Sequence, residues 1–376
     1  MSPGNAVSAT TSFAESRPAS VPSLARGLAT APSLALALLL VGCTHAPRHV
    51  AAPHAHFDGE RFKNLAPGES RNLWDVLKWQ LGPGEATPWP EWVEARTFPP
   101  PPMAVDDGVR VTFVNHATLL VQFGGTNILT DPVWSERVGP TSWLGPARHQ
   151  RPGVAFDALP RIHAVVLSHN HYDHFDEPTL RRLVERDMPL LIGGLGTGKL
   201  LEALGLGQAR AQDLDWWQSR NVRGVEITFA PAQHTSMRTL SDRDHTLWGS
   251  FFMKSKSRSG KSQSVYFAGD TAMGPHFRMV RERLGAPTVA LLPIGAYRPR
   301  WFMRVVHIDP FEAVMAHREL GAQKSVGMHW GTFDQADEGM DEPPLDLARA
   351  CAAARLEPRS FVALEHGDHV YLPSSR

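Results

Sequence analysis

Short apolar runs recur along the chain from residue 109 onward, and their composition is typical of β-strands. Each run is rich in Val, Ile, Leu, Phe or Thr and ends near Gly, Asp, Asn or Pro, the residues that bound strands. The strands expected on this basis are Val109–Val114, Thr118–Phe123, Asn127–Thr130, Ile162–Leu167, Val225–Ala230, Val265–Ala268, Ser325–Met328 and Phe361–Glu365.

Helical patterns lie between some of these strands. Asp176 precedes a proline in a first turn, and Leu180, Leu183 and Val184 then fall on one face, which predicts a helix capped by Asp176. A second helix is expected over Asp309–Leu320, where a capping pattern opens the segment. Strands followed by helices predict an α/β fold with several crossovers.

A dense group of polar residues follows the strand Ile162–Leu167: His169, His171, Asp173 and His174. Imidazole and carboxylate groups are the ligands that hold zinc and similar divalent ions. One metal rarely needs four ligands so close together, whereas two adjacent metals do, because each also keeps a position open for water. The alternative is a polar surface loop. An apolar strand leading directly into the ligands favours the metal site.

Further candidate ligands stand at the ends of later strands. A single histidine in such a position is more often structural than a ligand. Several residues in the same kind of position, in addition to the first cluster, predict that they complete one site. These residues are His234 after Val225–Ala230, Asp270 after Val265–Ala268 and His329 after Ser325–Met328.

The sequence around these residues resembles that of a known family. HxHxDH at residues 169–174, followed by a separated His, Asp and His, is similar to the pattern of metallo-β-lactamase-fold proteins. From about Val109 to about Tyr371 the chain resembles N-acyl-phosphatidylethanolamine-hydrolysing phospholipase D and its bacterial relatives. The segments that carry this resemblance are NHATLLVQ (115–122), LTDPVW (129–134), SHNHYDHFD (168–176), LDWWQ (214–218), LWGSF (247–251), FAGDT (267–271), PIGAYRPRWFM (293–303), HIDPFEAV (307–314), MHWGTF (328–333) and EPP (342–344).

The resemblance implies a fold and a set of metal ligands. The fold is a four-layer αβ/βα sandwich of the metallo-β-lactamase type, with the metals at one edge of the sheets. The expected cofactors are two Zn²⁺ ions, although other divalent metals also suit these ligands. The ligands implied are His169, His171 and His234 for one metal, Asp173, His174 and His329 for the other, and Asp270 as a bridge between them.

The resemblance also implies an activity. The expected function is that of a phosphodiesterase of phospholipase D type, which hydrolyses N-acyl-phosphatidylethanolamine or a similar phospholipid through a metal-bridging hydroxide. Asp173 and His307 are the candidate catalytic residues, and Arg298 and Arg300 are candidates to hold a phosphate. A structural role for His307 stays open. The alternatives are a lactonase or another ester hydrolase, or a non-catalytic metal-binding lipoprotein, against which the complete ligand set argues.

The first 43 residues resemble an export signal. The apolar stretch Leu34–Val41 is too short to span a bilayer but suits the core of a signal peptide. It ends in Leu-Val-Gly-Cys, which resembles a bacterial lipobox, so Cys43 is expected to carry the lipid. The protein is then expected as a membrane-anchored lipoprotein of the bacterial cell envelope, with the outer membrane preferred because Thr44 follows. The alternative is an ordinary signal peptide or an uncleaved anchor, in which Cys43 has no special role.

Residues 44–108 are expected to form an N-terminal segment before the catalytic domain, residues 109–376. Residues 44–60 are polar and contain His45, His49, His54 and His56, which indicates a solvated tether, with weak metal binding as the alternative. The following residues, 61–98, contain four tryptophans and are expected to pack on the domain.

Composition adds little to this picture. Hydrophobic residues make up 42% of the chain, which is ordinary for a globular protein with a buried core. Lys+Arg and Asp+Glu both number 38, and this balance gives no reason to expect nucleic acid as a partner. Histidine is frequent, with 18 residues, as expected of a metal enzyme.

Overall fold

The computed structural model describes residues 45–69, 71–82, 84, 86–256, 260 and 262–374. All of them belong to one unit of the chain, Gly42–Arg376. The expected signal peptide and lipobox, with Cys43, lie outside the described residues. Within the described ranges, no helix combines the length and the apolar character that crossing a membrane requires.

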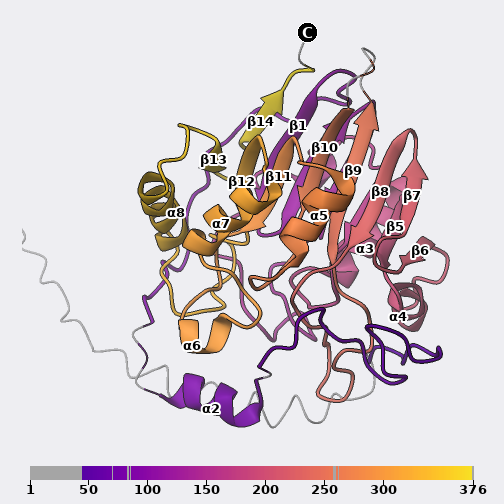
Figure 1. The fold of residues 1–376 in the computed structure, drawn as a ribbon, viewed down its shortest axis with the longest axis vertical. Coiled ribbons are helices and arrows are strands. Elements are labelled where there is room, and N and C mark those ends of the chain that lie inside the picture. The colour runs from indigo at the N-terminus through magenta and orange to yellow at the C-terminus, as the bar shows by residue number, and fades with distance from the viewer. Residues whose placement is uncertain are drawn as a thin grey trace, which may run out of the picture. The chain divides into compact units, whose positions relative to one another are not determined.

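The first of two sheets contains the strands nearest the start of the domain. It has seven strands, which are antiparallel from β14 to β3 and parallel from β3 to β6 (Figure 1). In spatial order they are β14 (His369–Leu372), β1 (Val109–Asn115), β2 (Thr118–Phe123), β3 (Thr126–Thr130), β4 (Ala164–Leu167), β5 (Leu190–Gly194) and β6 (Arg210–Leu214).

The second sheet also has seven strands, and its two halves likewise differ in direction. Strands β13 to β10 are parallel, and β10 to β7 are antiparallel. In spatial order they are β13 (Phe361–Ala363), β12 (Lys324–Met328), β11 (Val289–Pro293), β10 (Ser262–Phe267), β9 (Ser250–Lys256), β8 (Val225–Ala230) and β7 (Ser219–Val222).

Helices cover the outer face of each sheet. In Figure 1, α5 and α7 lie in front of the second sheet, and apolar side chains of both helices join its core. Helices α3 and α4 pack their leucines against the first sheet. The helix bounds are α2 (Leu73–Leu81), α3 (Glu177–Asp187), α4 (Thr197–Ala203), α5 (His276–Leu284), α6 (Arg300–Met303), α7 (Pro310–Leu320) and α8 (Glu342–Ala353), with a 3₁₀ turn at Phe156–Ala158.

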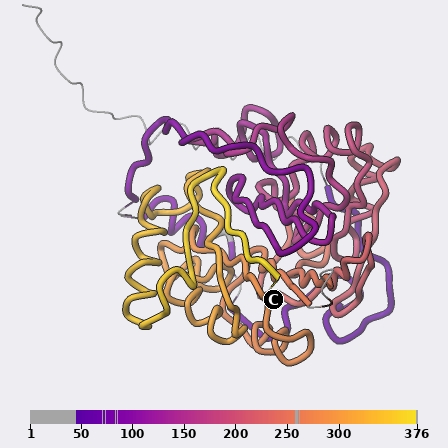
Figure 2. Tube along the Cα trace, turned by 90° about the horizontal axis from the view of Figure 1, so that it is seen from above, coloured from indigo at the N-terminus to yellow at the C-terminus, as the bar shows by residue number. Residues whose placement is uncertain are grey.

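Alternation along the strands divides the core into two parts. In β2, Leu119 and Val121 face the second sheet, whereas Leu120 between them faces the helices of the first. In Figure 2 the purple and magenta first half of the domain lies largely opposite the orange second half. The yellow C-terminal segment runs back toward the purple segments of the first half. The expected four-layer α/β sandwich is confirmed.

The ends of the predicted helices follow their sequence signals only in part. Asp309 accepts a hydrogen bond from the backbone N–H of Glu312 (2.8 Å) and caps α7 as expected. Asp176 does not cap α3 through its side chain. Its carboxylate instead accepts hydrogen bonds from the hydroxyl groups of Ser135 and Thr179, which tie the helix to the loop after β3. Asp176 therefore stands at the expected N-cap position of α3, but the side-chain hydrogen bond of a cap is not formed.

The N-terminal segment differs from the solvated tether that its polar composition indicated. Phe57 and Phe62 are 1% and 2% exposed and join the core, and Ala46 is also buried. The tryptophan-containing part packs as expected through Trp79 and Trp89, which donate hydrogen bonds to Asp337 and to the carbonyl of Glu338. Two phenylalanines are enough to hold a short polar segment against the domain. The domain limits themselves stay predictions.

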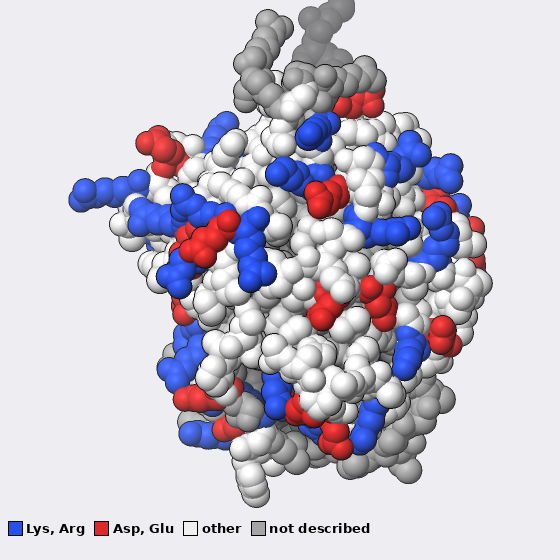
Figure 3. Space-filling view, turned by 45° about the vertical axis from the view of Figure 1, so that its right-hand side comes forward, with Lys and Arg blue, Asp and Glu red and all other residues white. Residues whose placement is uncertain are grey.

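Acidic and basic side chains are mixed on the surface. On the face drawn in Figure 3, Lys and Arg lie close to Asp and Glu, as equal numbers of the two kinds lead us to expect. Cys351 has a free thiol and packs against the core from α8.

Candidate metal centre

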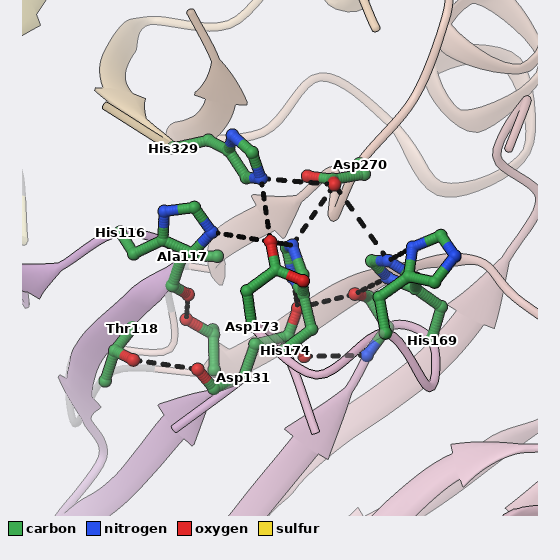
Figure 4. A network of polar contacts seen from close by, with 12 residues as sticks. His116, Ala117, Thr118, Asp131, His169, Asp173, His174, Asp270 and His329 are labelled. Carbon is green, nitrogen blue, oxygen red and sulfur yellow. Dashed lines mark hydrogen bonds and ion pairs between the residues drawn. The ribbon is translucent and has the colours of Figure 1, made fainter. Parts of the chain in front are cut away.

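All of the residues predicted as metal ligands lie together at one edge of the two sheets. Figure 4 shows His169, Asp173, His174, Asp270 and His329 of this group. The loop after β4 supplies the first cluster, and one further residue follows each of β8, β10 and β12. In the second sheet, β10 and β12 run parallel to β11 between them, and β8 points the same way because antiparallel β9 separates it from β10, so the carboxyl ends of all three strands lie at the same edge. The residues are His169, His171, Asp173, His174, His234, Asp270 and His329.

Three histidines form the first donor group. Nε2 of His169 lies 2.8 Å from Nδ1 of His171, which lies 3.3 Å from Nε2 of His234. Two ligand atoms on one tetrahedral zinc ion are about 3.4 Å apart, given bonds of roughly 2.0–2.1 Å. The three nitrogens therefore need to shift little to hold one ion.

The second donor group has similar spacing. Oδ2 of Asp173 lies 3.4 Å from Nε2 of His174 and 3.6 Å from Nε2 of His329. Nε2 of His174 and Nε2 of His329 are both buried, and neither has a hydrogen-bond partner among the described residues. Buried polar atoms are nearly always satisfied, so these two nitrogens fit a site built for a cation.

Asp270 lies between the two groups. Its Oδ2 is 3.1 Å from Nε2 of His174 and 3.2 Å from Nε2 of His329. The same oxygen is 3.9 Å from Nε2 of both His169 and His234. Its Oδ1 is buried without a hydrogen-bond partner in the described part of the chain. A carboxylate with one oxygen facing both groups suits two adjacent cations.

Neighbouring groups fix the orientation of the histidine rings. Nδ1 of His174 lies 2.7 Å from Oδ2 of Asp131, and Nδ1 of His234 lies 3.0 Å from the carbonyl oxygen of Val306. Nδ1 of His169 lies 2.9 Å from Oγ of Ser168. A proton on each Nδ1 would leave Nε2 with its lone pair directed into the site, as a metal ligand requires.

Asp173 is also held from outside the ligand set. Its Oδ2 lies 3.0 Å from Nε2 of His116 and accepts a hydrogen bond of 2.9 Å from the side-chain amide of Gln335. The backbone N–H of His329 donates to the carbonyl of His116 (2.7 Å), which connects two elements of the site directly. Sequence analysis did not single out Asp131 or Gln335.

The electrostatics of the cluster favour positive charge beside its two carboxylates. Burial lowers the pKa of His169 and His234 well below the usual value, so both are neutral. Burial opposes ionisation of Asp270, but His174 and His329 hold the pKa of this carboxyl well below its usual range. Burial alone would lower the pKa of His329, but the neighbouring carboxylate of Asp270 outweighs this effect and raises the pKa to about 9. The acidic pair Asp173 and Asp270 thus attracts positive charge, which metal ions can supply.

A cleft of about 330 Å³ opens onto the cluster. His307 reaches it from the loop before α7, with Nδ1 3.9 Å from Oδ2 of Asp270 and no hydrogen-bond partner among the described residues. Burial lowers the pKa of His307 to about 4. The residues that line the cleft are Val138, His171, Tyr172, Asp173, Met237, Arg238, Asp270, Ala296, Met303, His307, His329 and Gln335.

The arginines considered for phosphate binding have other partners. Arg298 forms ion pairs with Glu342 (2.7 Å) and Asp346 (3.3 Å), and it does not line the cleft. Arg300 pairs with Glu312 (2.8 Å) and donates to the carbonyl of His307 (2.9 Å), so it positions that histidine.

The arginine that does reach the cleft is Arg238, which sequence analysis missed. Its guanidinium stacks on Tyr172 at 4.0 Å and donates to the carbonyl oxygens of Asn170 and Phe175. No local sequence pattern marks it.

Comparison with known proteins places the chain in a family. Residues 126–330 match the model of the beta-lactamase superfamily domain. The chain belongs to the metallo-β-lactamase superfamily. As a member of this superfamily it is a metal-dependent hydrolase. The resemblance found in the sequence is thereby confirmed.

Two relatives within the superfamily carry the same name. N-acyl-phosphatidylethanolamine-hydrolyzing phospholipase D 1 of Caenorhabditis elegans is 35% identical over 70% of this chain and 76% of that protein. The mitochondrial N-acyl-phosphatidylethanolamine-hydrolyzing phospholipase D of Saccharomyces cerevisiae is 31% identical over 62% of this chain and 49% of that protein. Among solved structures, the isothiocyanate hydrolase from Delia radicum gut bacteria has a TM-score of 0.55 at 16% identity, over 70% of this chain and 100% of that one. That likeness shows the fold alone.

Proposed function

We propose that this metallo-hydrolase is a two-metal phosphodiesterase of phospholipase D type. Its substrate would be N-acyl-phosphatidylethanolamine or a similar phospholipid, which water cleaves to a phosphatidic acid and an N-acylethanolamine. The observation that carries the proposal is the position of Asp270, whose Oδ2 faces both donor groups. The two named relatives support the choice of substrate.

The residues divide between two ions. His169, His171 and His234 would hold the first, and Asp173, His174 and His329 the second, with Asp270 shared. Zinc suits this mixture of imidazole and carboxylate, and iron or manganese is the alternative. When bound, two such ions lower the pKa of a coordinated water toward neutrality and stabilise negative charge on the leaving oxygen.

The chain's own groups position the reactants. The carboxylate of Asp173, whose Oδ2 is fixed by His116 and Gln335, would also orient the attacking water. His307 is neutral at pH 7 because its pKa is about 4, so it donates a hydrogen bond to a phosphoryl oxygen without adding charge. Arg238 at the wall of the cleft supplies a positive charge for a phosphodiester anion.

A lipid substrate also agrees with the walls of the cleft. Val138, Met237 and Met303 line it beside the polar residues, and Met237 is 37% exposed. Apolar side chains of this kind can contact an acyl chain while the phosphate lies on the cluster. A lipid on Cys43 would keep such an enzyme at the surface of its substrate in the cell envelope.

The test uses the full chain and three substrates. Metal content is measured together with hydrolysis of N-acyl-phosphatidylethanolamine, a simple phosphodiester and a lactone. About two metals per chain, with phosphodiester hydrolysis that Asp270→Asn abolishes, would support the proposal. Two metals with lactone hydrolysis alone would keep the site and reject the substrate. Less than one metal after zinc supplementation, without hydrolysis of any of the three, would favour a binding role.

A further inference from the structure

A second group of possible ligands lies away from the cleft, where the N-terminal segment contacts the domain. Side-chain ligand atoms of His54, His56 and Asp215 all lie within 4.8 Å of one another. None of the three lines the catalytic cleft. We propose that these residues form a separate binding site for a transition-metal cation such as Zn²⁺, Ni²⁺ or Cu²⁺, which fastens the N-terminal segment to the domain.

The two histidines are presented by a tight turn. The backbone N–H of His54 donates to the carbonyl of Phe57 (2.8 Å), and the N–H of Phe57 donates back to His54 (3.1 Å). Phe57 is fully buried and anchors the turn. The rings of His54 and His56 consequently lie side by side, with centroids 4.6 Å apart and an angle of 80° between their planes. Two imidazoles are thus held together without help from a metal.

The domain holds the third ligand against them. Asp215 follows β6, and its Oδ1 lies 2.6 Å from Nε2 of His56. The same oxygen accepts a hydrogen bond of 2.7 Å from the backbone N–H of Trp216. The ring of His56 stacks on that of Trp216 at 4.3 Å, which fixes its orientation. Because His56 and Asp215 are already ordered, little conformational entropy remains to be lost on binding.

The chemistry of the three ligands decides the kind of cation. Two imidazoles and one carboxylate suit zinc, copper and nickel, whereas magnesium and calcium prefer sets of oxygen ligands. A cation would take the place of the hydrogen bond between His56 and Asp215, and His54, which is exposed, can turn its ring to complete the set. Three protein ligands leave at least one position for water.

The experiment is a titration of the full-length, metal-loaded enzyme with Zn²⁺ after removal of excess metal. Calorimetry should show that about one further Zn²⁺ ion binds per chain, in addition to the metal of the catalytic cluster. His54→Ala and Asp215→Asn should each weaken this additional binding by about tenfold or more, as expected when a site loses a ligand or its charge. Asp215→Asn keeps an oxygen opposite His56, so it separates loss of charge from loss of packing.

Two controls make the result specific. His369→Ala removes an exposed histidine whose Nδ1 lies 3.8 Å from Asp368 but which belongs to no group of candidate metal ligands among the described residues, and it should bind Zn²⁺ as the wild type does. Mg²⁺ should not compete. The proposal is overturned if no further equivalent binds, if His54→Ala binds as tightly as the wild type, or if Mg²⁺ displaces the zinc.

Discussion

Oδ2 of Asp131 lies 2.7 Å from Nδ1 of His174, and both side chains are fully buried. Asp131 also accepts a hydrogen bond from the backbone N–H of Ser168 (2.8 Å), the residue that precedes the ligand loop. A carboxylate that takes no place among the proposed ligands therefore joins the end of β3 to the loop after β4. This contact sets which nitrogen of His174 faces the candidate metal centre.

Asp131→Asn should weaken metal binding while it preserves the fold. The amide keeps the shape of the carboxylate but not its charge, so His174 becomes a less basic ligand. We expect the affinity for metal to fall by about 10–100-fold, measured by competition with a chelator. Circular dichroism checks that the fold is intact. If the variant binds metal as tightly as the wild type, Asp131 does not affect His174 as a metal ligand.

His307→Leu should lower kcat without loss of metal. The proposed role of His307 is a hydrogen bond donated to the substrate, leucine has no donor, and removing a donor of this kind lowers kcat by about 100-fold or more. Metal content is counted in the same preparations. Loss of metal from the variant would indicate that His307 is a metal ligand. An unchanged kcat would indicate that its role is structural only.

Gln335→Met tests the positioning of Asp173. The change keeps the length of the side chain and removes the amide that donates to Oδ2 of Asp173. A hydrogen bond to a charged group is worth roughly 1.5–3 kcal/mol, so we expect kcat to fall by about tenfold or more. Thermal unfolding should be unchanged. If kcat stays within about twofold of the wild type, His116 alone is sufficient to hold Asp173.

Stability should fall with pH below about 6.5 because of buried neutral histidines. Burial lowers the pKa of His276 to about 3 and that of His366 to about 4. In the unfolded chain both titrate near 6.5, so the unfolded state binds more protons than the folded state from pH 6.5 down to about 3 for His276 and down to about 4 for His366. Each histidine then lowers the unfolding free energy by up to about 1.4 kcal/mol per pH unit.

His276→Gln checks the sign of this effect. Glutamine cannot take up the proton, so the decline in unfolding free energy between pH 6.5 and pH 3 should be less steep than in the wild type. Urea unfolding at several pH values measures this slope. The groups of the metal cluster titrate in both proteins, so their contribution cancels in the comparison. Parallel curves would contradict the assignment of His276 as buried and neutral.

Phe57→Ala tests whether the N-terminal segment belongs to the folded unit. Its ring is 1% exposed and lies in the main core. Loss of a buried phenylalanine side chain costs about 3–5 kcal/mol, and a segment that merely tethers the domain would lose almost nothing. Urea unfolding distinguishes the two cases.

The sequence predicted which residues lie together at the candidate site better than it predicted the segments around them. The proposed ligands follow strands whose carboxyl ends meet at one edge, so position along the chain was enough to bring His234, Asp270 and His329 together with the first cluster. The resemblance then supplied the four-layer arrangement. Strand β11, with the sequence VALLP, was not expected because it is buried on both faces and shows no alternation.

Other parts of the site depend on contacts that no local pattern reveals. Gln335 and Asp173 are 162 residues apart in sequence, and Arg238 reaches the ligand loop from a distance of 68 residues. The docking of Phe57 was missed for a different reason. The residues around it are polar, and composition averages hide two buried rings in a short segment.

The most direct test of the central claim is hydrolysis of N-acyl-phosphatidylethanolamine in ¹⁸O-labelled water, with both products examined by mass spectrometry. Attack of water at phosphorus breaks the bond between phosphorus and the ethanolamine oxygen, so the account predicts one ¹⁸O atom in the phosphatidic acid and none in the N-acylethanolamine. Label in a released fatty acid would mean attack at a carbonyl carbon and would contradict the assignment as a phosphodiesterase.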